Sequence, residues 1–264
     1  MVMDFAATNQ YCFCSFEEVD IYSNVRHYLK KHPHLSISKI LKFGKQVASA
    51  LNYAHSHNIL HLHLTSKNIL IQPEQQERIV LTEFGVSKFL SETTMGEFTK
   101  STGILGVSDY IAPEQIQGDD EPCEKTDIYA YGCLLYQLAT GEPPFPSKFG
   151  YELAQAHLSK EPPPIEIKRK DFPKELSALI YKALNKKMDK RFGSFQEILD
   201  ELVRIKEHLE VKNLLNTDFG STLLEKYVGE KSVKKWWIIL PLLTIILSFI
   251  TFFLIPLLFQ YLDK

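Results

Sequence analysis

The chain has 264 residues, of which 45% are hydrophobic and 23% are charged, so it is long enough for one sizeable globular domain with appendages. Its formal net charge of −2 excludes a strongly basic nucleic-acid binder, and no nucleic-acid partner is expected. The four cysteines are too few and too scattered for a disulfide framework, which predicts reduced thiols in a cytosolic compartment.

Hydrophobic periodicity predicts a chain that is mainly helical. Apolar residues recur at helical spacing in six segments, and stop signals such as Pro33 and Gly141 follow two of them. The expected helices cover 20–31, the face from Ile40 to Ala54, 127–140, 149–159, 174–185 and 194–209. Ser36 or Ser38 is expected to cap the second of these helices.

Short apolar runs predict strands over 1–5, 69–71 and 79–81. The first strand is expected to lead into a loop, and the other two, separated by a polar segment, predict a hairpin. Residues 85–112 are rich in Ser, Thr and Gly without sustained periodicity, which predicts a long functional loop. Residues 211–235 are mixed and charged and are expected to form a linker.

The C-terminal residues 236–262 contain no charged side chain. Because about 20 apolar residues suffice to cross the hydrocarbon core, this run predicts a single transmembrane helix. Trp236, Trp237 and Tyr261 lie at its ends, where aromatic rings favour the membrane interface. More lysines precede the run than follow it, so the positive-inside rule places the large N-terminal part in the cytoplasm.

Five short motifs follow one another within the first two hundred residues. They read HLHLTSKNIL over 61–70, EFG over 83–85, APE over 112–114, DIYAYG over 127–132, and an arginine at 191. In order and spacing they resemble the catalytic loop, the D-F-G motif, the A-P-E motif, the buried Asp-helix segment and the structural arginine of protein kinases. The phrases YIAPEQ, TDIYAYG and ATGEPPF look most like bacterial Ser/Thr kinases of eukaryotic type.

The resemblance covers residues 1 to about 209 and implies a fold. The expected class is mainly α: a protein-kinase-like C-terminal lobe, helical with short β-hairpins, plus one C-terminal transmembrane helix. The expected domains are the lobe over 1–210, the linker over 211–235 and the membrane span over 236–262.

The resemblance also implies which residues would carry the chemistry. Phosphoryl transfer depends on positioning and on metal-bound phosphates, with an aspartate that accepts the proton of the substrate hydroxyl. His63 stands at the position of that catalytic aspartate, and Thr65 stands at the position of the loop lysine. Asn68 and Glu83 stand where the family holds magnesium and nucleotide, so ATP and Mg are implied only if a nucleotide binds.

A second group of residues occupies the family's structural positions. Glu114 is expected to pair with Arg191, and Asp127 is expected to brace the catalytic loop through backbone hydrogen bonds. The whole group comprises His61, Phe84, Gly85, Ala112, Pro113, Glu114, Asp127 and Arg191.

Several departures from the family pattern fall on catalytic positions. A neutral imidazole at His63 can accept a proton but supplies no negative charge, and a protonated one repels metal ions. Thr65 removes a cation, and Leu62 removes the arginine that docks a phosphorylated activation loop. Glu83 is one methylene longer than aspartate, which shifts its reach to magnesium.

The first strand, residues 1–5, resembles the strand that enters the hinge between the two kinase lobes. No Gly-x-Gly-x-x-Gly loop and no Val-Ala-Ile-Lys lysine precede it, so the N-terminal lobe is expected to be absent from this chain.

Together these departures favour a membrane-anchored pseudokinase that acts as a scaffold or regulator. Its expected partners are the membrane and a protein such as another kinase or a kinase-like N-terminal lobe. One alternative is a Ser/Thr protein kinase whose N-terminal lobe is missing from this chain, and another is a degenerating gene product without function.

The histidines offer one further hypothesis. His55, His57, His61 and His63 fall within nine residues, and imidazole suits zinc and copper. Their spacing matches no recognised ligand pattern, however, so a metal site is the weaker interpretation.

Overall fold

The computed structural model describes residues 2–7, 12–16, 23–72, 77–84, 108–118, 121–147 and 149–215. It divides the chain into two compact units, residues 1–206 and residues 207–264. Helix α10 crosses the boundary between the two units, and the other described elements lie in the first.

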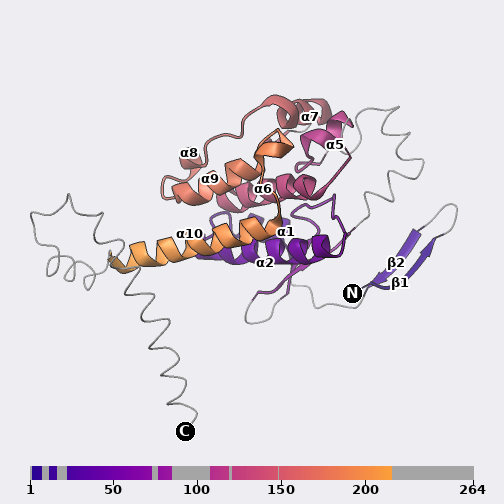
Figure 1. Cartoon of the computed structure of the whole chain (residues 1–264), viewed down its shortest axis with the longest axis horizontal. Coiled ribbons are helices and arrows are strands. Elements are labelled where there is room, and N and C mark those ends of the chain that lie inside the picture. Colours follow the sequence, from indigo (N-terminus) through magenta and orange to yellow (C-terminus); the bar gives the residue numbers. More distant parts are fainter. Residues whose placement is uncertain are drawn as a thin grey trace, which may run out of the picture. The chain divides into compact units, whose positions relative to one another are not determined.

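Most of the regular elements described in the first unit are helices (Figure 1). They are α1 (Val25–Lys31), α2 (Ile37–Ser56), α5 (Pro113–Gln117), α6 (Glu124–Thr140), α7 (Gly150–Ser159), α8 (Ile165–Lys168), α9 (Lys174–Ala183), the 3₁₀ helix η1 (Met188–Lys190) and α10 (Phe195–Leu215).

Helix α6 is the centre of the core. Every residue from Thr126 to Ala139 is buried, as expected for a helix that is apolar on all sides, and the helix packs against both α2 and α9. The contact with α2 is close because Gly44 has no side chain: a Cβ there would lie 2.9 Å from Leu135. Across the same contact the Tyr131 hydroxyl donates to the Gly44 carbonyl at 3.0 Å.

Two small antiparallel sheets are also present among the described residues of this unit. β1 (Val2–Ala7) pairs with β2 (Cys12–Phe16), and β3 (Ser23–Asn24), β4 (Ile69–Ile71) and β5 (Ile79–Leu81) pair in that order. The predicted hairpin of β4 and β5 is therefore present. The expectation of a loop after the first strand is wrong for β2, because backbone pairing with β1 makes an extended segment of Cys12–Phe16.

The helix ends differ from the prediction where local caps or pairings intervene. The first helix begins only at Val25, because Ser23 and Asn24 pair with β4 and Asn24 caps the helix by accepting from the His27 amide at 2.8 Å. Ser36 caps α2, as one of the two predicted alternatives, and accepts from the Lys39 amide at 3.2 Å.

Three short helices and one extension were not predicted. α5, α8 and η1 each have five residues or fewer, too few for a periodic pattern to develop. Helix α10 continues through Leu215, so residues 211–215 of the predicted linker are helical.

In the ranges that the structure describes, no helix has the length and apolar character needed to span a membrane. The predicted transmembrane helix over 236–262 lies outside those ranges, as does the linker after residue 215.

Candidate active site

Asp127, in the first turn of α6, fixes the backbone of the loop at His61–Leu62. Its carboxylate accepts from the His61 amide at 2.8 Å and from the Leu62 amide at 2.7 Å, and it lies 2.8 Å from His55 Nε2. The side chain is completely buried, and the N-terminus of a helix favours a negative charge. Asp127 thus occupies the bracing position that the resemblance implied.

Leu62 adopts a left-handed backbone conformation, with φ of 58°, which costs about 1–2 kcal/mol for a residue with a side chain. Its peptide groups are held on both sides: Asp127 accepts from the Leu62 amide, and Gln115 Nε2 donates to the Leu62 carbonyl at 3.1 Å. Glu83 is also left-handed, with φ of 67°.

Gln115 belongs to the site although no sequence motif predicted it. Its Oε1 accepts from the Ala112 amide at 3.1 Å while its Nε2 holds Leu62, so one side chain links the A-P-E segment to the catalytic loop. Its position in the sequence could have indicated a structural role, because a glutamine three residues after a helix N-cap residue is typical of a capping box. The contact with Leu62, 53 residues away, leaves no such local signal.

The Asn68 side chain holds the loop through hydrogen bonds to the loop backbone. Its Oδ1 accepts from the Thr65 amide at 2.8 Å, and its Nδ2 donates to the His63 carbonyl at 2.5 Å. The same Nδ2 lies 3.4 Å from Glu83 Oε2. Because the amide group is oriented by one backbone donor and one backbone acceptor, its nitrogen, not its oxygen, faces Glu83.

The structure brings His63 and Glu83 together. His63 Nδ1 lies 3.4 Å from Glu83 Oε2, beyond the usual range of an N–H···O hydrogen bond, and the two side chains are 41% and 50% exposed. Thr65, at the position of the loop lysine, is half-buried, and its Oγ1 accepts from the Lys67 amide at 3.3 Å. The altered positions therefore form a loose, partly exposed cluster.

His61 and Phe84 pack ring against ring behind this cluster, with centroids 4.5 Å apart. His61 is fully buried. Burial lowers the pKa of His61, and the charge of Asp127 offsets only part of this effect, so the imidazole is held neutral. Gly85, the third residue of the motif, lies outside the described residues.

Glu114 and Arg191 form a buried two-point ion pair with N···O distances of 2.8 and 2.9 Å. Arg191 also donates to three backbone carbonyls, those of Lys125, Asn185 and Lys186. Burial alone raises the pKa of the Glu114 carboxyl, but the hydrogen bonds and charge of Arg191 outweigh it and hold that pKa below its usual range. Ala112 and Pro113, which precede Glu114, are buried as well.

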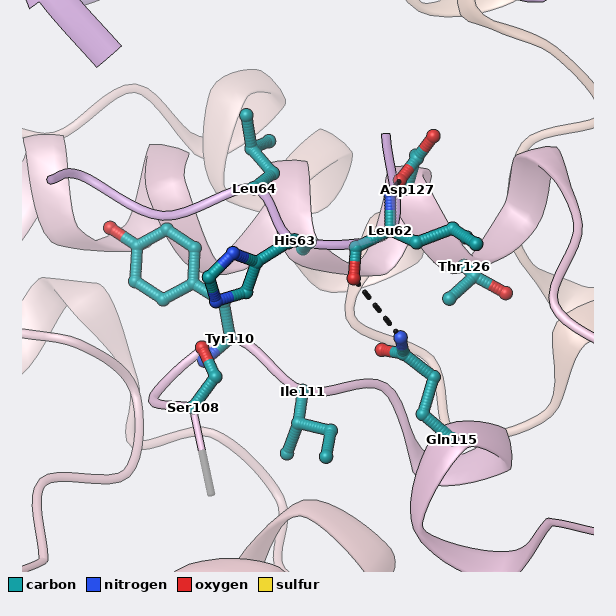
Figure 2. A pocket seen from close by; sticks show the side chains of 10 residues that line it. Leu62, His63, Leu64, Ser108, Tyr110, Ile111, Gln115, Thr126 and Asp127 are labelled. Atoms are coloured by element: carbon teal, nitrogen blue, oxygen red, sulfur yellow. Dashed lines mark hydrogen bonds between the residues drawn. The ribbon is translucent and has the colours of Figure 1, made fainter. Parts of the chain in front are cut away.

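A cavity of about 150 Å³ opens beside the loop. Figure 2 shows its two walls: one is the loop from Leu62 to Leu64, and the other is the segment from Ser108 to Ile111 that leads into α5. Gln115 spans the space between them through its hydrogen bond to Leu62, drawn as a dashed line. Because His63 lines this cavity, a group placed there would meet the imidazole.

The four-histidine metal hypothesis gains no support from the described residues, which contain no group of three or more His, Cys, Asp or Glu side chains able to hold an ion. His55 instead contacts Asp127, and His57, at the end of α2, contacts the Tyr53 carbonyl at 2.8 Å.

Magnesium also fits the residues present poorly. Mg²⁺ is a hard ion that prefers several oxygen ligands. Glu83 offers a carboxylate, but Asn68 turns its nitrogen to that carboxylate, and His63 places a second nitrogen 3.4 Å from it. One carboxylate with two nitrogen neighbours is a poor set of ligands for magnesium.

A buried helix that braces a histidine-containing loop through one aspartate, together with a buried Glu–Arg pair beneath an A-P-E segment, defines a lobe of the protein-kinase type. Comparison with known proteins agrees: residues 1–203 match the protein kinase domain. The chain belongs to the protein kinase family, of the eukaryotic-like type found in bacteria.

Three curated relatives illustrate the similarity. The chain is 33% identical to a probable serine/threonine-protein kinase of Clostridium acetobutylicum over 68% of its length, and 32% identical to PknB of Mycolicibacterium smegmatis over 60%. It is 28% identical to a probable PknB of Lactococcus lactis over 76% of its length. The matched segments cover 26%, 25% and 34% of those proteins, so the chain spans about a quarter to a third of their length.

Proposed function

We propose that this protein is a kinase-fold scaffold or regulator, anchored in a membrane, that binds another protein and does not transfer phosphoryl groups. The observation that carries the proposal is the His63–Glu83 contact: an imidazole occupies the position of the catalytic base and lies 3.4 Å from the remaining acidic group. Both residues hold positions where the family's chemistry calls for negative charge.

Phosphoryl transfer places two electrostatic requirements on a protein. The protein must hold metal ions on a triphosphate and stabilise the charge that develops during transfer. A neutral His63 contributes no negative charge to that task, and a protonated His63 pairs with Glu83 and repels a metal ion. By contrast the groups that hold the lobe in shape, Asp127, Glu114 and Arg191, are all present and fully engaged.

Nucleotide binding by the full-length chain, purified in detergent, tests the proposal. We expect no magnesium-dependent thermal stabilisation by ATP and no transfer of labelled phosphate to protein hydroxyls. A ligand at 100 times its dissociation constant would stabilise the fold by about 2.7 kcal/mol, which thermal unfolding detects readily. A magnesium-dependent shift accompanied by transfer would overturn the proposal in favour of an active Ser/Thr protein kinase.

A double variant tests the cause. His63→Asp with Glu83→Asp restores the family's two carboxylates, and we expect the variant to gain thermal stabilisation by magnesium ions that the unaltered chain should not show. The matched control is His57→Asp, which adds the same charge at the exposed end of α2 and should gain nothing. An equal response from both variants would exclude the His63–Glu83 contact as the determinant.

The partner is proposed to be another kinase or a kinase-like N-terminal lobe. Gln115 links the A-P-E segment to the loop, so this part of the lobe keeps a defined shape that such a protein could contact. Cross-linking of the full-length chain in its native membrane, followed by mass spectrometry, should recover a kinase-type protein; repeated recovery of unrelated proteins only would count against this partner.

The membrane anchor is proposed for residues 236–262, whose sequence contains no charge over a length sufficient to cross a bilayer. The chain should stay in the membrane pellet during extraction with alkaline carbonate. A variant with Leu247→Arg and Phe252→Arg should be released, because each arginine near the centre of a span costs about 2.5–3.5 kcal/mol on insertion. Release of the natural chain would exclude the anchor.

A further inference from the structure

One stretch of the chain carries no acidic residue. Residues 23–72 contain seven Lys and Arg and no Asp or Glu. The rest of the chain therefore contains 23 of the 30 Lys and Arg and all 32 Asp and Glu. A chain that is slightly acidic as a whole therefore gathers positive charge in the segment that forms β3, α1, α2 and the loop leading to β4.

Contacts between α1, α2 and the residues before β5 involve two of these cations, Lys39 and Lys42. The His32 ring lies against the Tyr28 ring, with centroids 4.5 Å apart, and the Tyr28 hydroxyl accepts from Lys39 Nζ at 2.5 Å. Lys39 Nζ also lies 2.7 Å from Glu77 Oε1, and Lys42 Nζ lies 3.9 Å from Glu77 Oε2. The end of α1 and the start of α2 are thus in contact through Tyr28 and Lys39, beside Glu77.

We give the name basic face to the cationic side chains of the last turn of α1, of the first half of α2 and of Arg78: Lys30, Lys31, Lys39, Lys42, Lys45 and Arg78. Lys30 and Lys31 are exposed in the last turn of α1, and Lys42 and Lys45 are exposed and three residues apart on α2. Among the described residues, Glu77 is the acid that contacts this face, and Lys39 already engages it. Within the ranges that the structure describes, Lys30, Lys31, Lys45 and Arg78 are exposed and form no salt bridge with an acidic side chain.

We propose that the basic face docks on an anionic lipid surface. The inference rests on the proposed membrane anchor, which holds the lobe on the cytoplasmic side, where anionic lipids attract basic segments. Each Lys or Arg near such a surface strengthens binding about fivefold, and the tether raises the effective concentration of the membrane, so a few cations suffice. The rest of the chain is acidic, so an anionic surface favours the orientation in which this face is turned toward it.

Lysine footprinting of the full-length protein tests the docking. The protein is reconstituted in nanodiscs of phosphatidylcholine alone or with one-third phosphatidylglycerol, and acetylation of each lysine is followed by mass spectrometry. Lys30, Lys31, Lys42 and Lys45 should react at least fivefold more slowly in the anionic discs. The difference should vanish near molar salt, where the screening length falls to about 3 Å. Lys187 and Lys190, exposed on and beside η1, should react alike in both discs.

Charge-reversal variants give a matched comparison. Lys42→Glu with Lys45→Glu should abolish the protection of Lys30 and Lys31, whereas Lys187→Glu with Lys190→Glu changes net charge equally and should leave it intact. Both pairs lie at exposed positions, so neither should disturb the fold.

The outcomes separate the docking from the anchor. An inserted protein whose lysines react equally in neutral and anionic discs overturns the docking and leaves the anchor standing. If the chain does not insert, the anchor fails, and the same footprint with added phosphatidylglycerol vesicles decides the docking: selective protection supports it and none overturns it. Stronger protection of these lysines by an RNA duplex than by the vesicles would overturn the lipid assignment in favour of nucleic acid.

Discussion

The Glu114–Arg191 pair and the His63–Glu83 pair each join an acid to a base, but in opposite surroundings. The first pair is 3% and 0% exposed and makes two contacts of 2.8 and 2.9 Å, whereas the second is 41% and 50% exposed with a single separation of 3.4 Å. Breaking a buried pair strands an uncompensated charge, while an exposed pair contributes about 0–1 kcal/mol. The buried pair therefore contributes strongly to the stability of the lobe, whereas the exposed pair at the candidate site contributes little.

The variant Arg191→Met tests this difference most strongly, because it leaves Glu114 charged and buried without the arginine. We expect a loss of about 3–5 kcal/mol in the free energy of unfolding, measured by thermal unfolding of the full-length chain. Arg204→Met is the control, because Arg204 is 74% exposed in its pair with Glu201 and should change stability by less than about 0.5 kcal/mol. Equal unfolding temperatures for the two variants would contradict the assigned role of the buried pair.

Acid should reveal a second consequence of burial. His157 has no exposed surface, and burial, followed by the charge of Lys186, lowers its pKa to about 3 from 6.5. Between those pH values the unfolded chain binds a proton that the folded lobe excludes, so stability should fall as pH decreases from 6.5 toward 3, by roughly a few kcal/mol in total.

His157→Gln provides the test, since glutamine can still contact the Tyr129 hydroxyl, which lies 2.9 Å from His157 Nδ1. Its stability should depend less on pH than that of the natural chain over this window. His34→Gln, at an exposed position, should reproduce the natural pH dependence; the same slope in both variants would rule out His157 as the titrating group.

Asp127→Asn probes how the core holds the loop. The amide replaces one carboxylate oxygen with a donor, so either the His61 or the Leu62 amide loses its acceptor. A hydrogen bond to a charged group contributes about 1.5–3 kcal/mol, and we expect a loss of that size in thermal unfolding. Asp189→Asn, at an exposed residue of η1, should change little. A small effect at Asp127 would mean that the left-handed Leu62 is held mainly by Gln115.

The smallest effect is expected within the site itself. His63→Ala removes a half-exposed imidazole and should alter the free energy of unfolding by less than about 1 kcal/mol. Asn68→Ala should cost more, about 1–3 kcal/mol, because it leaves the Thr65 amide and the His63 carbonyl without partners. A larger loss of stability for His63→Ala than for Asn68→Ala would show that His63 stabilises the loop, contrary to the contrast between the buried and the exposed pair.

Much of the fold was predictable because its signals are local. The periodicity of α2, α7 and α9 and the cap at Ser36 lie within a few residues of the structures they produce. The strand β2 was missed because its extended conformation depends on pairing with β1. The helix α8 was missed because four residues are too few for a periodic signal.

The family motifs, the order of the main helices and the expectation that His63 and Glu83 stand at catalytic positions all come from the sequence. Other contacts appear only in the folded structure: Asp127 with a loop 65 residues away, Gln115 with Leu62, and Lys39 with Tyr28 of α1. The physical reason is that such contacts depend on how helices pack around α6. Packing joins residues distant in the chain and leaves no periodic trace along it.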